Sequence, residues 1–215
     1  MADDHRDKSD GSADPLAQIR RGGPTALAGL FMQHRQRLRR MIHVRLDRRV
    51  AGRVDPSDVL QEAYLDASRR LEEYLADPRM PLFLWLRFLT GQRLLAIHRQ
   101  HLGTQKRDPR QEVALGRRSM PWADSASLSI ELLGRLTTPS RAAIRGEMQA
   151  RLEDLLGKLD PLDREILALR HYEELTNNEA AEELGISTAA ASKRYIRALE
   201  RLRTVLASVP GFGQS

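Results

Sequence analysis

The 215-residue sequence contains no cysteine, few aromatic residues and no long apolar run. Without cysteine, disulfide bonds, thiolate metal ligands and cysteine nucleophiles are excluded. The first residues are polar and acidic, so no secretory signal is expected, and no stretch approaches the roughly 18 apolar residues of a membrane helix. These absences predict a cytoplasmic protein without membrane insertion.

The composition that remains favours helices over sheets. Aromatic residues make up 5% of the chain and charged residues 30%, and long runs of β-branched residues are missing. Alanine, leucine, arginine and glutamate, which are good helix formers, dominate. We therefore predict an all-α protein.

Charge is distributed unevenly along the chain. There are 35 Lys and Arg against 29 Asp and Glu, which gives a net charge of +6. Eight arginines lie between Arg35 and Arg53 with one acid, Asp47, whereas the first fourteen residues carry five aspartates. A basic patch of this kind favours a polyanion partner, usually nucleic acid.

Periodicity divides the chain into two helical domains. We expect a three-helix bundle and a four-helix module, joined by a flexible basic linker with one short helix at most and flanked by polar ends. In order, the predicted segments are a disordered acidic extension (1–24), the bundle (25–102), the linker (103–140), the module (141–207) and a tail (208–215).

The stretch "LTNNEAAEELGISTAAASKRYIRALERL" predicts two short helices with a tight turn between them. Thr176 and Glu179 form a capping box, Gly185 ends the first helix, and Ser187 caps the second. This pattern favours a helix-turn-helix that reads DNA, and a plain helical hairpin with a solvated basic face is the alternative. The outward residues proposed to contact duplex DNA are Thr188, Ser192, Lys193, Arg194 and Arg197.

The segment "LDPLDREILALRHYEELTNNEAAEELGISTAAASKRYIRALERLR" resembles the −35-binding region of bacterial sigma factors of the sigma-70 superfamily, extracytoplasmic-function class. The resemblance implies a helix-turn-helix that binds the −35 promoter element as duplex. The sequence departs from the family pattern at Ala180, where isoleucine is usual, and at Ala190 and Ala191, where threonine and valine are usual.

A second segment, "DPSDVLQEAYLDASRRLEEY", is similar to the part of the same family that docks on core RNA polymerase. Asp55 and Pro56 are expected to start this helix. Four acids spaced 3, 4 and 4 apart give it an acidic face, which suits a basic partner and, taken alone, equally suits solvent. The resemblance implies polymerase contacts by Asp58, Leu60, Gln61 and Glu62.

A third segment, "LFLWLRFLTGQRLLAIHRQHLG", resembles the family's −10-recognising segment. The chain has Thr90-Gly91-Gln92 where the family usually has Ala-Arg-Asn, and Trp85 is expected in the core rather than as a stacking platform. Promoter opening requires cations for the backbone and a pocket for unstacked bases. The candidates are Arg87, Gln92, Arg93, His98 and Arg99.

No arrangement of residues indicates catalysis or a cofactor. His98 and His101 are three apart on a helix but lack further ligands, so we predict no metal site. We predict a sigma factor, monomeric when free, with core RNA polymerase, promoter DNA and an anti-sigma factor as partners. Two alternatives are a stand-alone helix-turn-helix repressor or activator, and a nucleic-acid enzyme that uses the two histidines.

Two parts of the chain fit the family less closely. The linker is longer than expected, and by family architecture its basic stretches "QKRDPR" and "GRR" would run towards the polymerase active-site channel. The acidic extension either shields basic surfaces or serves as a solubilising tail.

Overall fold

A computed structural model describes residues 14–102, 120–136 and 142–207. Every regular element in these three ranges is helical, which confirms the all-α prediction. No helix in the described ranges is both long and apolar enough to cross a membrane.

The first three helices of the N-terminal bundle, residues 15–102, each begin at an aspartate cap. Asp55 accepts a hydrogen bond from the backbone N–H of Ser57, and Pro56 follows in the first turn, as the sequence predicts. The tyrosine–tryptophan pair Tyr74 and Trp85 stacks at 4.1 Å between ring centres. The bundle consists of α1 (Pro15–Arg45), α2 (Arg48–Ala51), α3 (Pro56–Arg69), α4 (Leu71–Ala76) and α5 (Leu82–Leu102).

The first helix starts earlier than we predicted, because residues 15–24 are helical rather than disordered. Asp14 caps the backbone N–H of Leu16, and Ile19 is buried in the core, which supplies the apolar contact that orders this turn. Gly23 interrupts the helix with a φ of 55°, a conformation that glycine adopts readily. Residues 1–13 of the predicted extension lie outside the described residues.

The second half of the predicted linker is also folded. Met120, Ala123 and Leu128 are buried, and α7 (Ser125–Leu136) packs against both α1 and α8. The N–H of Asp124 donates to the carbonyl of Val44 at 2.9 Å. Leu128, Leu132 and Leu133 supply the buried stripe of this helix, and the prolines, serines and charges around it are what favoured a linker in the sequence. The basic stretches of the linker lie outside the described residues.

The C-terminal unit, residues 142–207, contains four α-helices and one π-helical turn. Asp160 caps the second of these helices and Pro161 stands in its first turn. The elements are α8 (Ala142–Lys158), α9 (Pro161–Leu167), η3 (Ala168–Tyr172), α10 (Asn177–Leu184) and α11 (Thr188–Ala207).

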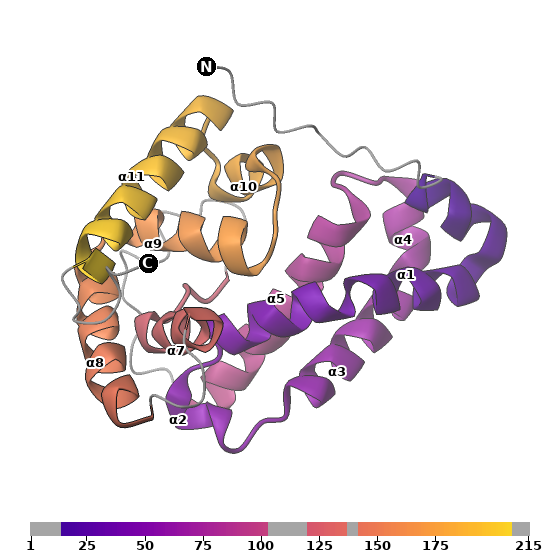
Figure 1. Ribbon diagram of the computed structural model, residues 1–215. Coiled ribbons are helices and arrows are strands. Elements are labelled where there is room, and N and C mark those ends of the chain that lie inside the picture. The colour runs from indigo at the N-terminus through magenta and orange to yellow at the C-terminus, as the bar shows by residue number, and fades with distance from the viewer. Residues whose placement is uncertain (1–13, 103–119, 137–141, 208–215) are drawn as a thin grey trace.

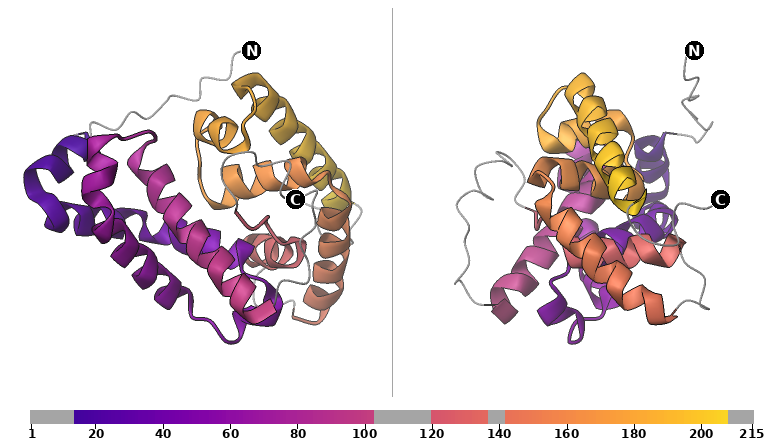
Figure 2. Two further views of the ribbon diagram at one scale, coloured as in Figure 1. Left: turned by 180° about the vertical axis from the view of Figure 1, so that it is seen from behind. Right: turned by 60° about the vertical axis from the view of Figure 1, so that its left-hand side comes forward.

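The two units lie against each other, with α7 packed at their junction (Figures 1 and 2). Buried side chains of both units belong to one continuous apolar cluster. The end of α1 meets η3, and the carbonyl of Leu128 on α7 accepts a hydrogen bond from the Tyr172 hydroxyl. The C-terminal unit is therefore seated on the bundle in this structure.

Candidate nucleic-acid interface

Helices α10 and α11 form a helix-turn-helix whose ends follow the predicted pattern. The Thr176 hydroxyl accepts from the N–H of Glu179, and the Glu179 carboxylate accepts from the N–H of Thr176. Gly185 ends α10 with a φ of 64°, and the Ser187 hydroxyl accepts from the N–H of Ala190. The capping box, the left-handed glycine and the second cap are all confirmed.

The exposed turns of α11 carry most of the residues assigned to duplex DNA. Thr188 and Lys193 are exposed, and Ser192 is half-buried beside them. Ala191 and Ala198 are fully buried on the opposite face, where they pack the helix onto α9 and α10. The helix therefore presents a short, polar N-terminal face followed by cations.

The two arginines assigned to duplex DNA are bound to one buried carboxylate, Asp163. Arg197 donates to it through Nε at 2.8 Å and Nη2 at 2.5 Å, and Arg194 donates through Nη1 at 2.9 Å. Burial alone would raise the pKa of the Asp163 carboxyl, but the hydrogen bonds and charges of the two arginines outweigh it and lower the pKa. Sequence reasoning missed this residue, because an acid in the first turn of α9 is an ordinary helix feature.

The residues assigned to polymerase binding divide into exposed and buried groups. Asp58, Gln61 and Glu62 are exposed on one face of α3, whereas Leu60 is 2% exposed and packs in the core. The acidic face is shorter than the sequence pattern indicates, because Arg93 binds Asp66 through two hydrogen bonds of 2.6 and 2.5 Å.

The five residues assigned to melted DNA do not form one surface. Arg87 is 1% exposed and lies between the two units, and Arg93 is partly exposed while paired with Asp66. Gln92 accepts a hydrogen bond from Arg70 at 3.3 Å, and Arg99 is exposed. Roles in DNA binding for these residues stay predictions, and Arg87 is inaccessible in this conformation.

His98 has a structural contact of its own. Its Nε2 accepts a hydrogen bond of 3.2 Å from the backbone N–H of Asp47, and burial lowers the pKa of the imidazole below its usual 6.5. Because the imidazole is neutral, its Nε2 atom can accept this hydrogen bond, which stabilises the turn between α1 and α2. Within the described ranges no three His, Asp or Glu side chains cluster as they would around a metal ion.

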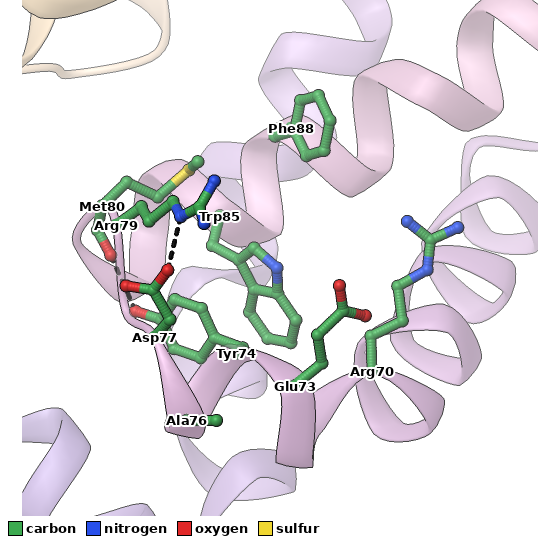
Figure 3. Close-up of a pocket in the computed structure, with 9 residues that line it drawn as sticks. All are labelled: Arg70, Glu73, Tyr74, Ala76, Asp77, Arg79, Met80, Trp85 and Phe88. Atoms are coloured by element: carbon green, nitrogen blue, oxygen red, sulfur yellow. Dashed lines mark hydrogen bonds and ion pairs between the residues drawn. The ribbon is translucent and has the colours of Figure 1, made fainter.

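A cavity of about 430 Å³ opens where α4 ends and α5 begins (Figure 3). The Trp85 ring stands on one side of it, backed by Tyr74, whose hydroxyl donates to the carbonyl of Met80 at 2.9 Å. The sequence break "DPRMP" is the signal for this cavity, since it separates the two helices. The lining residues are Arg70, Glu73, Tyr74, Ala76, Asp77, Arg79, Met80, Trp85 and Phe88.

The C-terminal unit has four α-helices, and the last two form a capped helix-turn-helix with cationic side chains on its outer helix. These features place the unit in the helix-turn-helix class. Residues 155–204 match the family Sigma-70, region 4. A 60-residue stretch is 40% identical to the RNA polymerase sigma-E factor of Streptomyces avermitilis, and the match covers 28% of this chain and 34% of that protein. The chain thus spans about a third of the length of this curated relative.

The fold is similar to a solved structure of CnrH in complex with the cytosolic domain of CnrY. The likeness has a TM-score of 0.51 and 22% sequence identity, and it covers 90% of this chain and 96% of CnrH. The comparisons therefore show a sigma-70 region 4 in the C-terminal unit and an overall fold like that of CnrH.

Proposed function

We propose that this chain binds core RNA polymerase and directs it to promoters, reading the −35 element as duplex and the −10 element as melted strand. One observation carries the proposal: residues 155–204 match sigma-70 region 4 and fold into a helix-turn-helix with a cationic outer helix. We expect no catalysis by the chain itself.

Helix α11 is the proposed −35 reader. Its first turns are small and polar, which lets the helix enter the major groove, and its arginines follow at the flank, where phosphates lie. Arg197 is 48% exposed even though it is bound to Asp163. A guanidinium that is already oriented loses less conformational entropy when it binds a phosphate.

The cavity at the α4–α5 junction is the proposed site for an unstacked −10 base. Trp85 and Phe88 supply aromatic surface on which a base stacks, and the exposed guanidinium of Arg79 lies at the rim, paired with Asp77 at 2.5 Å. A base turned out of the duplex needs both an aromatic wall and cations for its phosphates. Trp85 combines a core position with this role, since it is 7% exposed and lines the cavity.

The exposed face of α3 is the proposed polymerase contact. Asp58, Gln61 and Glu62 supply acidic and polar groups, and Leu65, 43% exposed, adds an apolar contact beside them. Leu60 is buried and does not contact a partner itself. Its packing in the core holds the exposed face of α3 in position. A mixed acidic and apolar face suits a protein partner with basic and apolar groups.

An anti-sigma factor is a further proposed partner. The similarly folded CnrH was solved with a bound protein, the cytosolic domain of CnrY, which supports a protein partner for this fold.

Two binding measurements test the proposal. Selection from random duplexes with the purified chain is expected to return a single enriched motif, and titration with core polymerase is expected to give a saturable complex. Binding to duplex DNA without binding to core polymerase would favour a stand-alone repressor or activator instead. A random pool with no enriched motif would count against reading of the −35 element.

A further inference from the structure

Two of the proposed contact surfaces meet at the Arg93 side chain on α5. Arg93 belongs to the residues proposed for the −10 strand, and its Nη1 atom lies 3.6 Å from Oε2 of Glu62, which belongs to the proposed polymerase face on α3. The side chain of Arg93 is 32% exposed and that of Glu62 is 55% exposed. One cation therefore borders both surfaces and is accessible from outside.

Asp66 holds the inner edge of the Arg93 guanidinium. Its two carboxylate oxygens accept from Nε at 2.6 Å and from Nη2 at 2.5 Å, and this paired geometry fixes the plane of the guanidinium. The hydrogen bonds from Arg93 lower the pKa of the Asp66 carboxyl and outweigh the opposing effect of its partial burial. The carboxylate is therefore ionised, and Arg93 has a defined orientation.

The outer edge of the same guanidinium remains available. A guanidinium has five N–H donors, and the contact with Asp66 uses two of them. At 3.6 Å, Nη1 is too far from Glu62 for a hydrogen bond, and the Arg93 side chain makes no other hydrogen bond to the described residues. Its Nη1 and Nη2 atoms can therefore bind two oxygens of one phosphate.

Polar side chains connect Arg93 to the cavity at the α4–α5 junction. The side-chain oxygen of Gln92, the preceding residue, accepts from Nη1 of Arg70 at 3.3 Å, and Arg70 lines the cavity. Arg70 and Arg79 stand on opposite sides of the Trp85 ring (Figure 3). A strand with one base on this ring has a phosphate on each side of that base, so Arg70 and Arg93 lie where one half of the strand would run.

Glu62 and a phosphate compete for the outer edge of Arg93. Both are anions, and Glu62 is close enough to attract the guanidinium and to repel a phosphate that approaches it. A basic group of polymerase that binds Glu62 weakens both effects. Polymerase docking then favours strand binding, and the strand favours docking by the same factor, because coupling between two binding sites is reciprocal.

We infer that Arg93, held by Asp66, couples the two surfaces: when polymerase binds Glu62, the outer edge of Arg93 is released for a phosphate of the −10 strand. The inference rests on the proposed function and adds a route by which polymerase binding strengthens binding of the strand. Exposed ion pairs are weak, so the expected coupling is about two- to fivefold in Kd.

Glu62→Gln imitates the polymerase-bound state in the free chain, because it removes the anion that competes with phosphate. The probe is fluorescein-labelled oligothymidine, since phosphate contacts and base stacking tolerate any sequence. Fluorescence anisotropy is expected to show a Kd about two- to fivefold lower than that of the parent chain. Asp58→Asn makes the same charge change one turn away on the same exposed face, and screening limits its expected effect to about 1.5-fold.

Arg93→Lys separates the geometry of the side chain from its charge. Lysine keeps the positive charge but lacks the fork that binds Asp66 on one edge and a phosphate on the other. In an Arg93→Lys background, Glu62→Gln is therefore expected to change the Kd by no more than the Asp58→Asn control does. Denaturant titration checks that each variant is folded.

The outcomes separate this coupling from the proposed function. If Glu62→Gln binds oligothymidine no more tightly than Asp58→Asn does, the coupling is wrong and the proposed function stands. The coupling is also wrong if the gain from Glu62→Gln persists with lysine at position 93, or if the parent chain binds the probe only with core polymerase present, because a weak surface pair does not explain so large an effect. If the parent chain does not bind the probe even with core polymerase, reading of the −10 strand is wrong and the inference falls with it.

Discussion

At the residue scale, the arginines proposed to contact DNA are already engaged by carboxylates of the chain. Asp163 is fully buried and binds both Arg194 and Arg197, which holds the two guanidinium groups in a fixed orientation. Asp163 is therefore expected to favour phosphate binding by orienting the two arginines, although its own negative charge repels a phosphate.

Changing Arg194 or Arg197 to Ala is expected to weaken binding to the selected −35 duplex and to flatten its salt dependence. Each substitution removes about one phosphate contact, so the slope of log K against log salt falls by about 0.9. Titrations over a range of salt concentrations measure this. Arg69→Ala, which removes an exposed arginine from α3, is the control, and an unchanged slope in the α11 variants would show that the DNA face is assigned wrongly.

Glu173→Gln is expected to cost about 3 to 5 kcal/mol of unfolding free energy, because it removes the carboxylate that the buried guanidinium groups of Arg45 and Arg87 share and leaves each of them with one other glutamate. Glu174→Gln is the matched control at the next position; its side chain is 52% exposed, so a loss below about 1 kcal/mol is expected. Denaturant titration measures both. A loss for Glu173→Gln no larger than for its neighbour would contradict a structural role for the buried pair.

The same pair gives a pH prediction. The pKa of Glu173 is lower in the folded chain than its ordinary value of 4.5, so its contribution is full above about pH 4.5 and lost as pH falls through the folded pKa. The difference in unfolding free energy between the parent chain and Glu173→Gln is therefore expected to shrink below pH 4.5. A difference that stays constant with pH would contradict an ionised Glu173.

At the element scale, the turn between α10 and α11 depends on one backbone conformation. Gly185→Ala is expected to cost about 1 to 2 kcal/mol, since its φ of 64° disfavours any side chain. Gly52→Ala is the control, because its φ is −82° and an added Cβ at either position meets no atom within 4 Å. Equal effects on the unfolding free energy would mean that the turn carries no special constraint.

Helix α3 supplies a prediction that separates the two proposed partners. Asp58→Lys is expected to weaken core polymerase binding by about tenfold or more, because it places a like charge against a basic partner surface. Binding to the isolated −35 duplex is expected to stay the same. Glu72→Lys on α4 makes the same charge change at another exposed position, and an equal loss there would mean that only net charge matters.

Local features of the fold were predictable from the sequence, because caps and turns depend on residues within a few positions of each other. The capping box at Thr176 and the cap at Asp55 are examples. Long-range ion pairs were not predictable: Glu165 and Glu183 read as ordinary helix acids, and Arg45 as one more surface arginine. Only the packing of the two units shows that these residues are buried.

The candidate site likewise has features that the sequence predicts and features that depend on long-range contacts. Thr188 and Lys193 are exposed as helix periodicity requires, whereas the aromatic cavity was not predicted, because the sequence shows only a helix break beside it and indicates a core position for Trp85. Arg87 was assigned to DNA by its place in a family motif, and its burial depends on contacts with Glu183 of α10 and with Glu173, the residue after η3, that no local pattern reveals.

At the scale of the whole molecule, two helical units share one continuous core and a buried set of charges. Part of the basic stretch of α1 is paired within the chain, because Arg40 binds Glu174 and Arg45 binds Glu165 and Glu173.

Run-off transcription with purified core polymerase on a library of DNA fragments tests whether this chain directs promoter-specific initiation. We expect discrete products that depend on the chain, from fragments that share one −35 motif and one −10 motif. If the chain yields no promoter-specific product and does not bind core polymerase, the proposed function is wrong.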